Sequence, residues 1–163
     1  MVFILFISFL ILQRLFELFI SSKNEKWLLA NGAVEYGKEH YPFIVALHTL
    51  FIISLIVEYF WRGVADVNFV LLALFFVLIT IKVVVISTLG TYWNTKIYKV
   101  PGTRPVSTGI YKYVKHPNYI IVICEIAVIP LTFHLYYTAI AFTILNAVML
   151  TVRIRKENEV LAM

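Results

Sequence analysis

Five apolar stretches divide this chain, and their length restricts its fold more than any other feature. About 20 apolar residues in a helix are needed to cross the hydrocarbon core of a bilayer. Only 14% of the residues are charged and 61% are hydrophobic, whereas soluble domains carry about 25% charged residues. The sequence therefore predicts an all-α integral membrane protein with about five transmembrane helices. The apolar stretches cover residues 1–20, 43–61, 69–89, 119–133 and 135–152.

The last two stretches are separated by only a few residues around the letters HLYY. Such a short connection predicts an antiparallel helical hairpin. Pro130 lies within the first of these two stretches and should kink that helix or mark its end. The N-terminal stretch lacks a basic segment and a cleavage site, so we interpret it as a retained span. We expect one membrane domain over residues 1–163, made of a two-helix region at 1–64 and a core at 65–163.

Lysine and arginine are concentrated in alternate polar segments. They occur throughout residues 21–42, residues 90–118 and the tail from Arg153, whereas residues 62–68 contain only Arg62. The positive-inside rule then predicts a non-cytoplasmic N-terminus in a bacterial cytoplasmic membrane, with every basic segment and any cofactor pocket on the cytosolic side. The basic residues that give the chain its net charge of +5 lie between the apolar stretches, which suits binding to an anionic membrane surface and not to a nucleic acid.

Five charged residues lie inside or near the apolar stretches. Arg14 and Glu17 are three residues apart, so we expect them to pair with each other or to reach the membrane interface. Glu58 and Lys82 are expected at the interface because they sit close to span ends. Glu125 lies about two turns into its stretch and should face the bundle interior with a partner. Whether that pairing is structural or functional stays open.

The remaining candidate residues do not form a familiar soluble-enzyme motif. The histidines at 40, 48, 116 and 134 lack metal-ligand spacing, so no metal site is expected. His48 is expected to be a packing residue with its polar atoms satisfied. The single cysteine, Cys124, permits no intramolecular disulfide. Glycine-rich nucleotide-binding motifs and the GxSxG motif are absent.

Two polar segments flank the predicted hairpin. The first is GIYKYVKHPNY, residues 109–119, and the second is RIRKEN, residues 153–158. Pro117 suits the first turn of a helix, and the free N–H groups of that turn make an electropositive patch beside His116. A hairpin would bring His116 and Tyr119 close to Arg153 and Glu157. The pattern alone is equally compatible with basic side chains that reach the membrane surface and include an ordinary i,i+4 ion pair.

This combination of segments resembles the isoprenylcysteine carboxyl methyltransferase family. The family pattern is similar to GIYKYVKHPNY, followed by a hydrophobic hairpin and then RIRKEN. The stretch LGTYWNTKI, residues 89–97, also resembles the family, and the likeness extends over about residues 65–161. The N-terminal stretch from Gln13 to Pro42 is similar to a bacterial branch with an extra N-terminal region. Residues 65–163 are therefore interpreted as a methyltransferase-like core.

The resemblance implies a membrane methyltransferase that uses S-adenosylmethionine. The cofactor would enter from the cytosol, and a lipophilic acceptor would enter from the bilayer between helices. Glu157 and tyrosine rings would accommodate a cationic sulfonium or ammonium, and Arg153 would orient an anionic acceptor oxygen. The implied cofactor-binding residues are Trp93, Thr95, Tyr111, Lys115, His116, Pro117, Tyr119 and Glu157. The implied catalytic residues are Arg153, Glu157 and Asn158.

Two positions depart from the family pattern. Asn158 stands where the family has a second glutamate, and Ile121 stands where a glycine is often found. Both departures weaken the case for strict prenylcysteine specificity. We therefore expect O-methylation of a lipid-tailed hydroxyl such as an alkylpyrone, with a prenylcysteine-type carboxylate as the other O-acceptor.

Other classes remain open from sequence. They are a phospholipid N-methyltransferase, a sterol-type membrane reductase and a non-enzymatic lipid-binding membrane protein. A transport or lipid-binding protein is expected to place polar residues along its span interiors. Here the polar residues gather at one predicted membrane face, which favours an enzyme.

Overall fold

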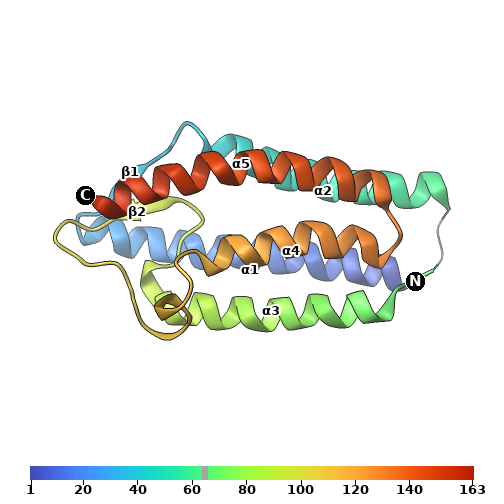
Figure 1. Cartoon of the computed structure of the whole chain (residues 1–163), viewed down its shortest axis with the longest axis horizontal. Coiled ribbons are helices and arrows are strands. Elements are labelled where there is room, and N and C mark those ends of the chain that lie inside the picture. Colours follow the sequence, from blue (N-terminus) through green and yellow to red (C-terminus); the bar gives the residue numbers. More distant parts are fainter. Residues whose placement is uncertain (64–65) are drawn as a thin grey trace.

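The computed structural model describes residues 1–63 and 66–163, which form an elongated bundle of helices (Figure 1). The predicted boundary between residues 64 and 65 lies outside the described residues. The five predicted helices are present, and the last two form the predicted antiparallel hairpin. The elements are α1 (Val2–Ala30), β1 (Val34–Tyr36), α2 (Tyr41–Arg62), α3 (Phe69–Leu89), η1 (Gly90–Tyr92), β2 (Ile97–Lys99), η2 (Gly109–Lys112), α4 (Pro117–Thr132) and α5 (Tyr136–Ala162).

Within the described part of the chain, four of the helices are long and apolar enough to cross a membrane. These are α1, α2, α5 and the continuous stretch Phe69–Tyr92 that begins with α3. The remaining helix, α4, has 16 residues and is shorter than a full span. The apolar side chains that these helices turn outward, such as Phe16, Phe19 and Ile140, are largely exposed. An apolar surface of this extent is typical of a protein embedded in lipid.

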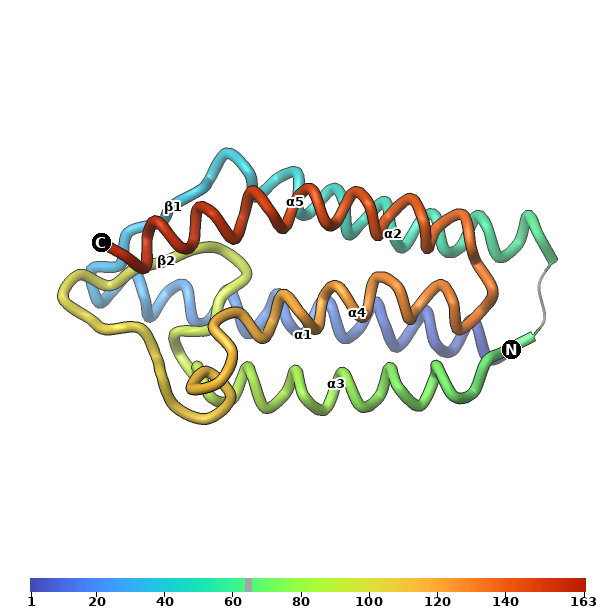
Figure 2. Tube along the Cα trace, in the orientation of Figure 1, coloured from blue at the N-terminus to red at the C-terminus, as the bar shows by residue number. Residues whose placement is uncertain are grey.

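Helix α4 lies in the middle of the bundle, in contact with α3 and α5. Ten of its 16 residues are buried, whereas Ile120 and Ile123 are exposed on one face. Ile126 and Ile129 of α4 pack in one cluster with Phe6, Phe75 and Phe133 from other parts of the chain. Figure 2 shows α4 running between the path of α3 and the pair formed by α2 and α5. The position of α4 therefore depends on three neighbouring helices.

Local sequence signals explain where several helices begin and end. The Asn68 side chain accepts hydrogen bonds from the backbone N–H groups of Val70 and Leu71, both at 3.1 Å, and so caps α3. Pro117 occupies the first turn of α4, where its missing N–H costs nothing. Pro130 lies in the last turn of α4, which ends two residues later at Thr132. Pro130 thus marks the end of this helix.

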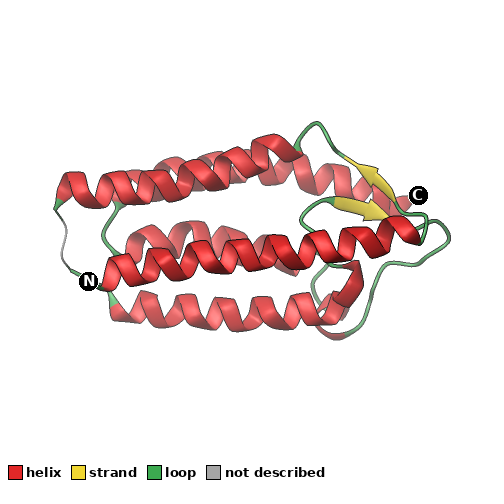
Figure 3. Ribbon diagram, turned by 180° about the vertical axis from the view of Figure 1, so that it is seen from behind, coloured by secondary structure: helices red, strands yellow, loops and turns green. Residues whose placement is uncertain are grey.

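A short antiparallel sheet joins two loops at the end of the bundle that carries the C-terminus (Figure 3). Its register pairs Val34 with Lys99 and Tyr36 with Ile97. The sequence did not predict this sheet, because three-residue strands produce no recognisable periodicity. Both strands belong to the basic loops, so the sheet fixes the loop after α1 against the loop after α3.

A buried cluster of four charged residues links three helices inside the bundle. The Nζ of Lys82 on α3 lies 2.7 Å from Glu125 Oε2 on α4 and 3.2 Å from Glu17 Oε1 on α1. Arg14 lies 3.0 Å from both Glu17 and Glu125. The prediction that Glu125 faces the interior with a partner is confirmed. The expected Arg14–Glu17 pair is also present, but it is part of this larger cluster.

The interfacial position expected for Lys82 is wrong, whereas Glu58 lies near a span end but is buried. Lys82 is 3% exposed and belongs to the buried cluster, and Glu58 is 5% exposed. Glu58 lies near a span end, but its carboxylate accepts hydrogen bonds from the backbone N–H groups of Tyr137 and Thr138, at 3.1 and 2.7 Å. It therefore caps α5, whose first turn has free N–H groups. Sequence alone does not show which neighbouring helix end a buried carboxylate meets.

The ion cluster predicts a charge-balance effect on stability. Lys82→Met should lower the free energy of unfolding by about 3–5 kcal/mol, because one buried carboxylate then lacks a compensating charge. The double variant Lys82→Met/Glu125→Gln restores neutrality and should lose less. Unfolding of the purified protein in detergent measures both effects. Thr80→Val, at an exposed position on the same helix, serves as the control. A Lys82→Met protein as stable as the native one would contradict the prediction.

Candidate functional site

The residues that the sequence placed at the hairpin base do meet in the structure. Tyr119 donates a hydrogen bond to Glu157 and accepts one from Arg153 Nε at 2.9 Å. The two ring nitrogens of His116 lie 3.5 Å from Glu157 Oε1 and 3.0 Å from Asn158 Oδ1. A single network therefore joins the start of α4 to the end of α5.

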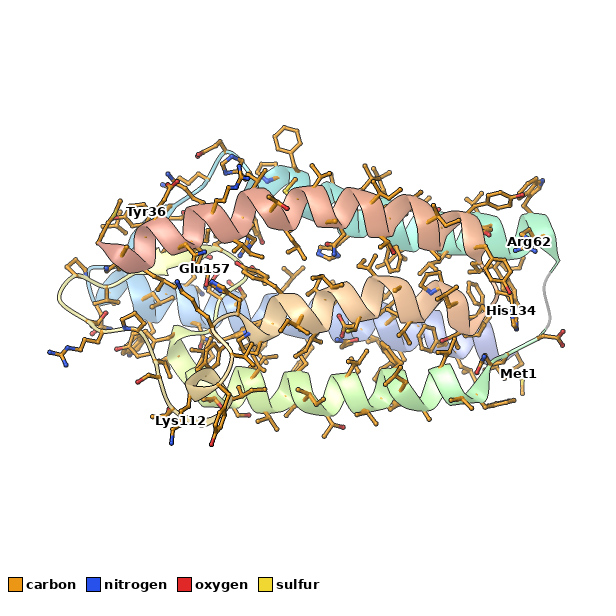
Figure 4. The ribbon with its side chains drawn as sticks, viewed as in Figure 1. Met1, Tyr36, Arg62, Lys112, His134 and Glu157 are labelled. Carbon is orange, nitrogen blue, oxygen red and sulfur yellow. The ribbon has the colours of Figure 1, made fainter. Side chains whose placement is uncertain are left out.

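The hairpin geometry explains this meeting. His116 is the residue before Pro117, so it stays out of the helical conformation and occupies the N-cap position of α4, with its side chain free of capping bonds. Arg153 and Glu157 are four residues apart on α5, so they share one helix face. Figure 4 shows Glu157 at the end of the bundle that carries Tyr36 and Lys112, far from Arg62 and His134. The network thus lies at the basic end of the molecule.

A polar cavity of about 580 Å³ opens beside this network. Its walls come from the loop after α3, the start of α4 and the end of α5. Such a volume lies within the range that binds small molecules and cofactors. Among the described residues that line it, Glu157 is the single carboxylate, whereas several lysines and arginines line the rim.

A second cavity of about 340 Å³ lies deeper, between α1 and α2. Its walls are mostly apolar and include Leu15 and Leu18 from α1 with Ile44 and Ile52 from α2. The polar and apolar cavities share one wall. The residues that line both cavities are Trp93, Asn94, Asn118, Tyr119 and Arg153. This wall separates a polar compartment from an apolar one by the thickness of a few side chains.

His48 on α2 also lines the apolar cavity, and its buried Nδ1 has no hydrogen-bond partner among the residues that the structure describes. The charged residues of the same cavity, Arg14, Glu17 and Lys82, pair with one another and with Glu125 instead. The expectation of a packing histidine with satisfied polar atoms is therefore wrong.

The structure gives each predicted site residue a definite place. Trp93, Tyr119 and Arg153 line both cavities. Thr95 lines the apolar cavity alone, and its carbonyl accepts a hydrogen bond from Arg153. Ile121 lines neither cavity and is buried in the hydrophobic core. The residues that line the polar cavity alone are Tyr111, Lys115, His116, Pro117, Glu157 and Asn158.

Two polar residues on α1 hold the shared wall and were missed from sequence. Asn24 donates hydrogen bonds to the carbonyls of Trp93 at 2.7 Å and Gly90 at 3.1 Å. Ser21 Oγ lies 2.9 Å from Thr95 Oγ1, and the Ser21 carbonyl accepts a bond from Asn94 Nδ2 at 2.9 Å. A signal existed, because Ser21 and Asn24 are three residues apart on one face of a long helix. Their partners are about 70 residues away, which sequence spacing does not reveal.

A second missed group fixes the loop after Thr95. Lys96 Nζ lies 2.7 Å from Glu25 Oε1, and the Tyr98 hydroxyl donates to the same oxygen at 2.6 Å. The hydrogen bond to Glu25 raises the pKa of Lys96, although burial opposes the shift. Burial, followed by the bond to Glu25, raises the pKa of Tyr98. Both side chains therefore keep their protons at neutral pH and hold β2 against α1.

The ionisation of His116 depends on its neighbours in the polar cavity. The hydrogen bond to Glu157 raises the pKa of His116 above its ordinary value of 6.5, and Asn158 adds to this, while burial opposes it. Both ring nitrogens face oxygen acceptors, an arrangement that suits the imidazolium. Burial raises the pKa of Tyr111, so its phenol stays neutral. The cavity thus contains a histidine that is charged over a wider pH range than usual.

This shift predicts a pH-dependent contribution to stability. Because the folded pKa of His116 is raised, its stabilisation is complete below pH 6.5 and is lost as the pH rises through the folded pKa. The apparent melting temperature of the native protein should therefore fall over this range more steeply than that of His116→Asn. Glu157→Gln should flatten the profile as well, because it removes the main cause of the shift. Parallel profiles for the native and His116→Asn proteins would contradict the assignment.

Comparison with known proteins identifies the family. Residues 70–163 match the model of the isoprenylcysteine carboxyl methyltransferase (ICMT) family. The chain is 42% identical to the uncharacterized protein YpbQ of Bacillus subtilis, over 96% of this chain and 95% of the relative. It is 30% identical to an uncharacterized protein of Haemophilus influenzae, over 91% of this chain and 88% of that relative. No solved structure gives a significant match.

These matches confirm the resemblance inferred from the GIYKYVKHPNY and RIRKEN segments. The matched region contains α3 from its second residue onward, α4, α5 and the loops that line the polar cavity. The apolar helices of the structure agree with a membrane location. The chain therefore belongs to the isoprenylcysteine carboxyl methyltransferase family of membrane methyltransferases.

Proposed function

We propose that this protein is an S-adenosylmethionine-dependent O-methyltransferase that acts on a lipophilic acceptor drawn from the membrane. The observation that carries the proposal is the wall shared by the polar and apolar cavities. Methyl transfer requires a donor and an acceptor to be aligned at contact distance with water excluded. A water-soluble donor and a lipid-like acceptor could meet across the side chains of Tyr119 and Arg153, which line both cavities.

The residues of the polar cavity suit the proposed donor. When bound, S-adenosylmethionine supplies a methyl group on a positively charged sulfonium. Glu157 is the one carboxylate among the described residues that line this cavity, so it is the group able to offset that charge or the ammonium of the donor. The rings of Trp93, Tyr111 and Tyr119 add faces that attract cations. His116 would orient Glu157 through the contact that already joins them.

The apolar cavity suits a lipophilic acceptor. It lies between α1 and α2, whose outward side chains, such as Phe16 and Leu50, are exposed as in lipid-facing helices. An acceptor could therefore enter from the bilayer without crossing the polar cavity. Arg153 lies in the shared wall, where its guanidinium would orient the acceptor oxygen toward the donor. The acceptors that we propose are a lipid-tailed hydroxyl such as an alkylpyrone, or a prenylcysteine-type carboxylate.

The proposal includes an orientation in the bacterial cytoplasmic membrane. Both basic loops and the tail lie at the end of the bundle that carries the polar cavity, whereas Met1 and the α4–α5 turn lie at the other end. The positive-inside rule then places the N-terminus outside and the polar cavity in the cytosol, where S-adenosylmethionine is made.

Calorimetric titration with S-adenosylhomocysteine tests the cofactor assignment. The purified protein in detergent should bind this product, and Glu157→Ala and His116→Ala should each weaken binding about tenfold to a hundredfold, as expected for lost hydrogen bonds with charged groups. Arg153→Ala should reduce turnover more than it reduces binding, because Arg153 is assigned to the acceptor oxygen.

Two neighbouring residues on α5 provide matched controls. Arg155 and Glu159 are exposed and line neither cavity, so Arg155→Ala and Glu159→Ala should bind the product like the native protein. Absence of binding by the folded native protein would refute the methyltransferase proposal. Normal binding by all three site variants would refute the site assignment but not the reaction class.

Thiol labelling in intact cells tests the orientation. In a Cys124→Ser background, a membrane-impermeant maleimide should label Asp66→Cys in intact cells and Lys38→Cys only after lysis. Both positions are exposed, and they lie in the segments that precede and follow α2, at its opposite ends. The reverse pattern would overturn the proposed orientation and would leave the fold unaffected.

A further inference from the structure

The polar cavity carries more positive charge than the proposed donor can balance. Six lysine and arginine side chains line it, against the single carboxylate of Glu157 among the described residues. S-Adenosylmethionine is itself a cation at neutral pH, because its sulfonium and ammonium outnumber its one carboxylate. Like charges repel one another more strongly where water is partly excluded. A further anion is therefore expected at this cavity.

The protein already engages three of the six cations and leaves the other three to the solvent. Lys112, Lys115 and Arg104 are exposed, and none of them forms an ion pair or a side-chain hydrogen bond with a described residue. The uncompensated charge thus lies at the mouth of the cavity. The engaged cations are Lys96, Lys99 and Arg153, whose partners are Glu25, the Val160 carbonyl and Tyr119.

The segment that carries Lys112 and Lys115 lies beside the end of a candidate membrane span. The η2 turn packs so closely on α3 that a Cβ at Gly109 would lie 3.1 Å from Cγ2 of Thr88. The two residues after Gly109 pack against the hydrophobic core. Thr88 is about one turn from the end of the candidate span Phe69–Tyr92, so this level corresponds to a membrane–water interface. Figure 4 shows Lys112 beside this end of α3.

Exposed aromatic side chains mark the same level. Tyr113 follows Lys112 in the chain and is 81% exposed, and the Nζ of Lys112 lies 5.8 Å from the centre of its ring. Trp27 and Tyr92, whose ring centres are 5.5 Å apart, are also exposed. Tryptophan and tyrosine are enriched at membrane–water interfaces. Basic and aromatic side chains at one level suit a lipid headgroup better than a soluble anion.

We propose that Lys112, Tyr113 and Lys115 bind the headgroup of an anionic phospholipid at the mouth of the polar cavity. The two ammonium groups would donate hydrogen bonds to the phosphate, and the Tyr113 ring would lie among the neighbouring headgroups. The acyl chains would hold the phosphate at the level of the two lysines. Lys115, which the resemblance implied as a cofactor-binding residue, is assigned here to the lipid.

The site has a consequence for donor binding, and this consequence rests on the proposed methyltransferase function. A phosphate at the cavity mouth would offset part of the excess positive charge, so it would strengthen the binding of cationic S-adenosylmethionine. S-Adenosylhomocysteine has a neutral sulfur, so its binding should respond less. The charge of the membrane lipid would thereby control how readily the enzyme takes up its donor.

Native mass spectrometry tests the lipid site directly. The purified protein in detergent is titrated with phosphatidylglycerol or with phosphatidylcholine of the same acyl chains. The native protein should bind the first phosphatidylglycerol about tenfold more tightly than the first phosphatidylcholine, as expected for two lysines near one headgroup. Lys112→Gln/Lys115→Gln should lose most of this preference. Glycerol 3-phosphate, which has the phosphate without acyl chains, should not displace the lipid.

Lys23 and Lys26 on α1 provide the matched control. Both are exposed and line neither cavity, so Lys23→Gln/Lys26→Gln removes the same charge and should keep the preference. Equal affinities of the native protein for the two lipids would overturn the proposal. An equal loss in the two double variants, or displacement of the lipid by glycerol 3-phosphate, would overturn it too. If the first double variant is unstable, Lys112→Gln and Lys115→Gln are measured singly.

Donor binding to the protein in lipid nanodiscs tests the consequence separately. The native protein should bind S-adenosylmethionine about threefold to tenfold more tightly in phosphatidylglycerol than in phosphatidylcholine, and S-adenosylhomocysteine should gain less. Lys112→Gln should lose most of this gain, whereas Lys23→Gln/Lys26→Gln should keep it. An equal gain in Lys112→Gln would overturn the link between lipid and donor. Failure of the native protein to bind either molecule would refute the methyltransferase proposal, while mass spectrometry decides the lipid site on its own.

Discussion

The ion pairs between Glu125, Lys82 and Arg14 are the constraint on which the rest of the structure depends. Glu125 is completely buried, so it requires partners within the protein, and they come from two other helices. In an apolar medium an unpaired carboxylate is far more costly than in water. The pairing therefore fixes the position of α4 along the bundle axis relative to α1 and α3. Because the first turn of α4 carries Pro117 and Tyr119, the same pairing also fixes the place of these cavity-lining residues.

The arrangement suits the proposed reaction. The proposed methyl donor is charged and water-soluble and the proposed acceptor is lipid-like, so an enzyme that joined them would need one compartment for each. The α4–α5 hairpin supplies this boundary, because Tyr119 and Arg153 from its two arms lie between the polar and the apolar cavity. Asn24 and Ser21 hold the third part of the boundary, the segment around Trp93 and Thr95. The boundary is thus built from side chains that are bonded to one another.

Much of this could be predicted from the sequence, and the failures have physical causes. The five helices follow from apolar length, and the meeting of His116 and Glu157 follows from a hairpin with a short turn. The burial of Lys82 could not be predicted, because a lysine near a span end commonly reaches the interface. Its partners lie on helices that are distant in sequence. The small sheet and the hydrogen bonds of Asn24 could not be predicted either, because single long-range contacts leave no periodic pattern in the sequence.

The β1–β2 sheet has a consequence for how acceptor choice is encoded. The apolar cavity takes most of its lipid-side wall from α1 and α2, whereas the family match begins at residue 70. The polar cavity is lined entirely from within the matched region. The backbone pairing of Val34–Tyr36 with Ile97–Lys99 connects these two regions and holds them in a fixed relative position. Under the proposed function, substitutions in the N-terminal region would change the shape of the apolar cavity, and with it the acceptor, while the polar cavity stays the same.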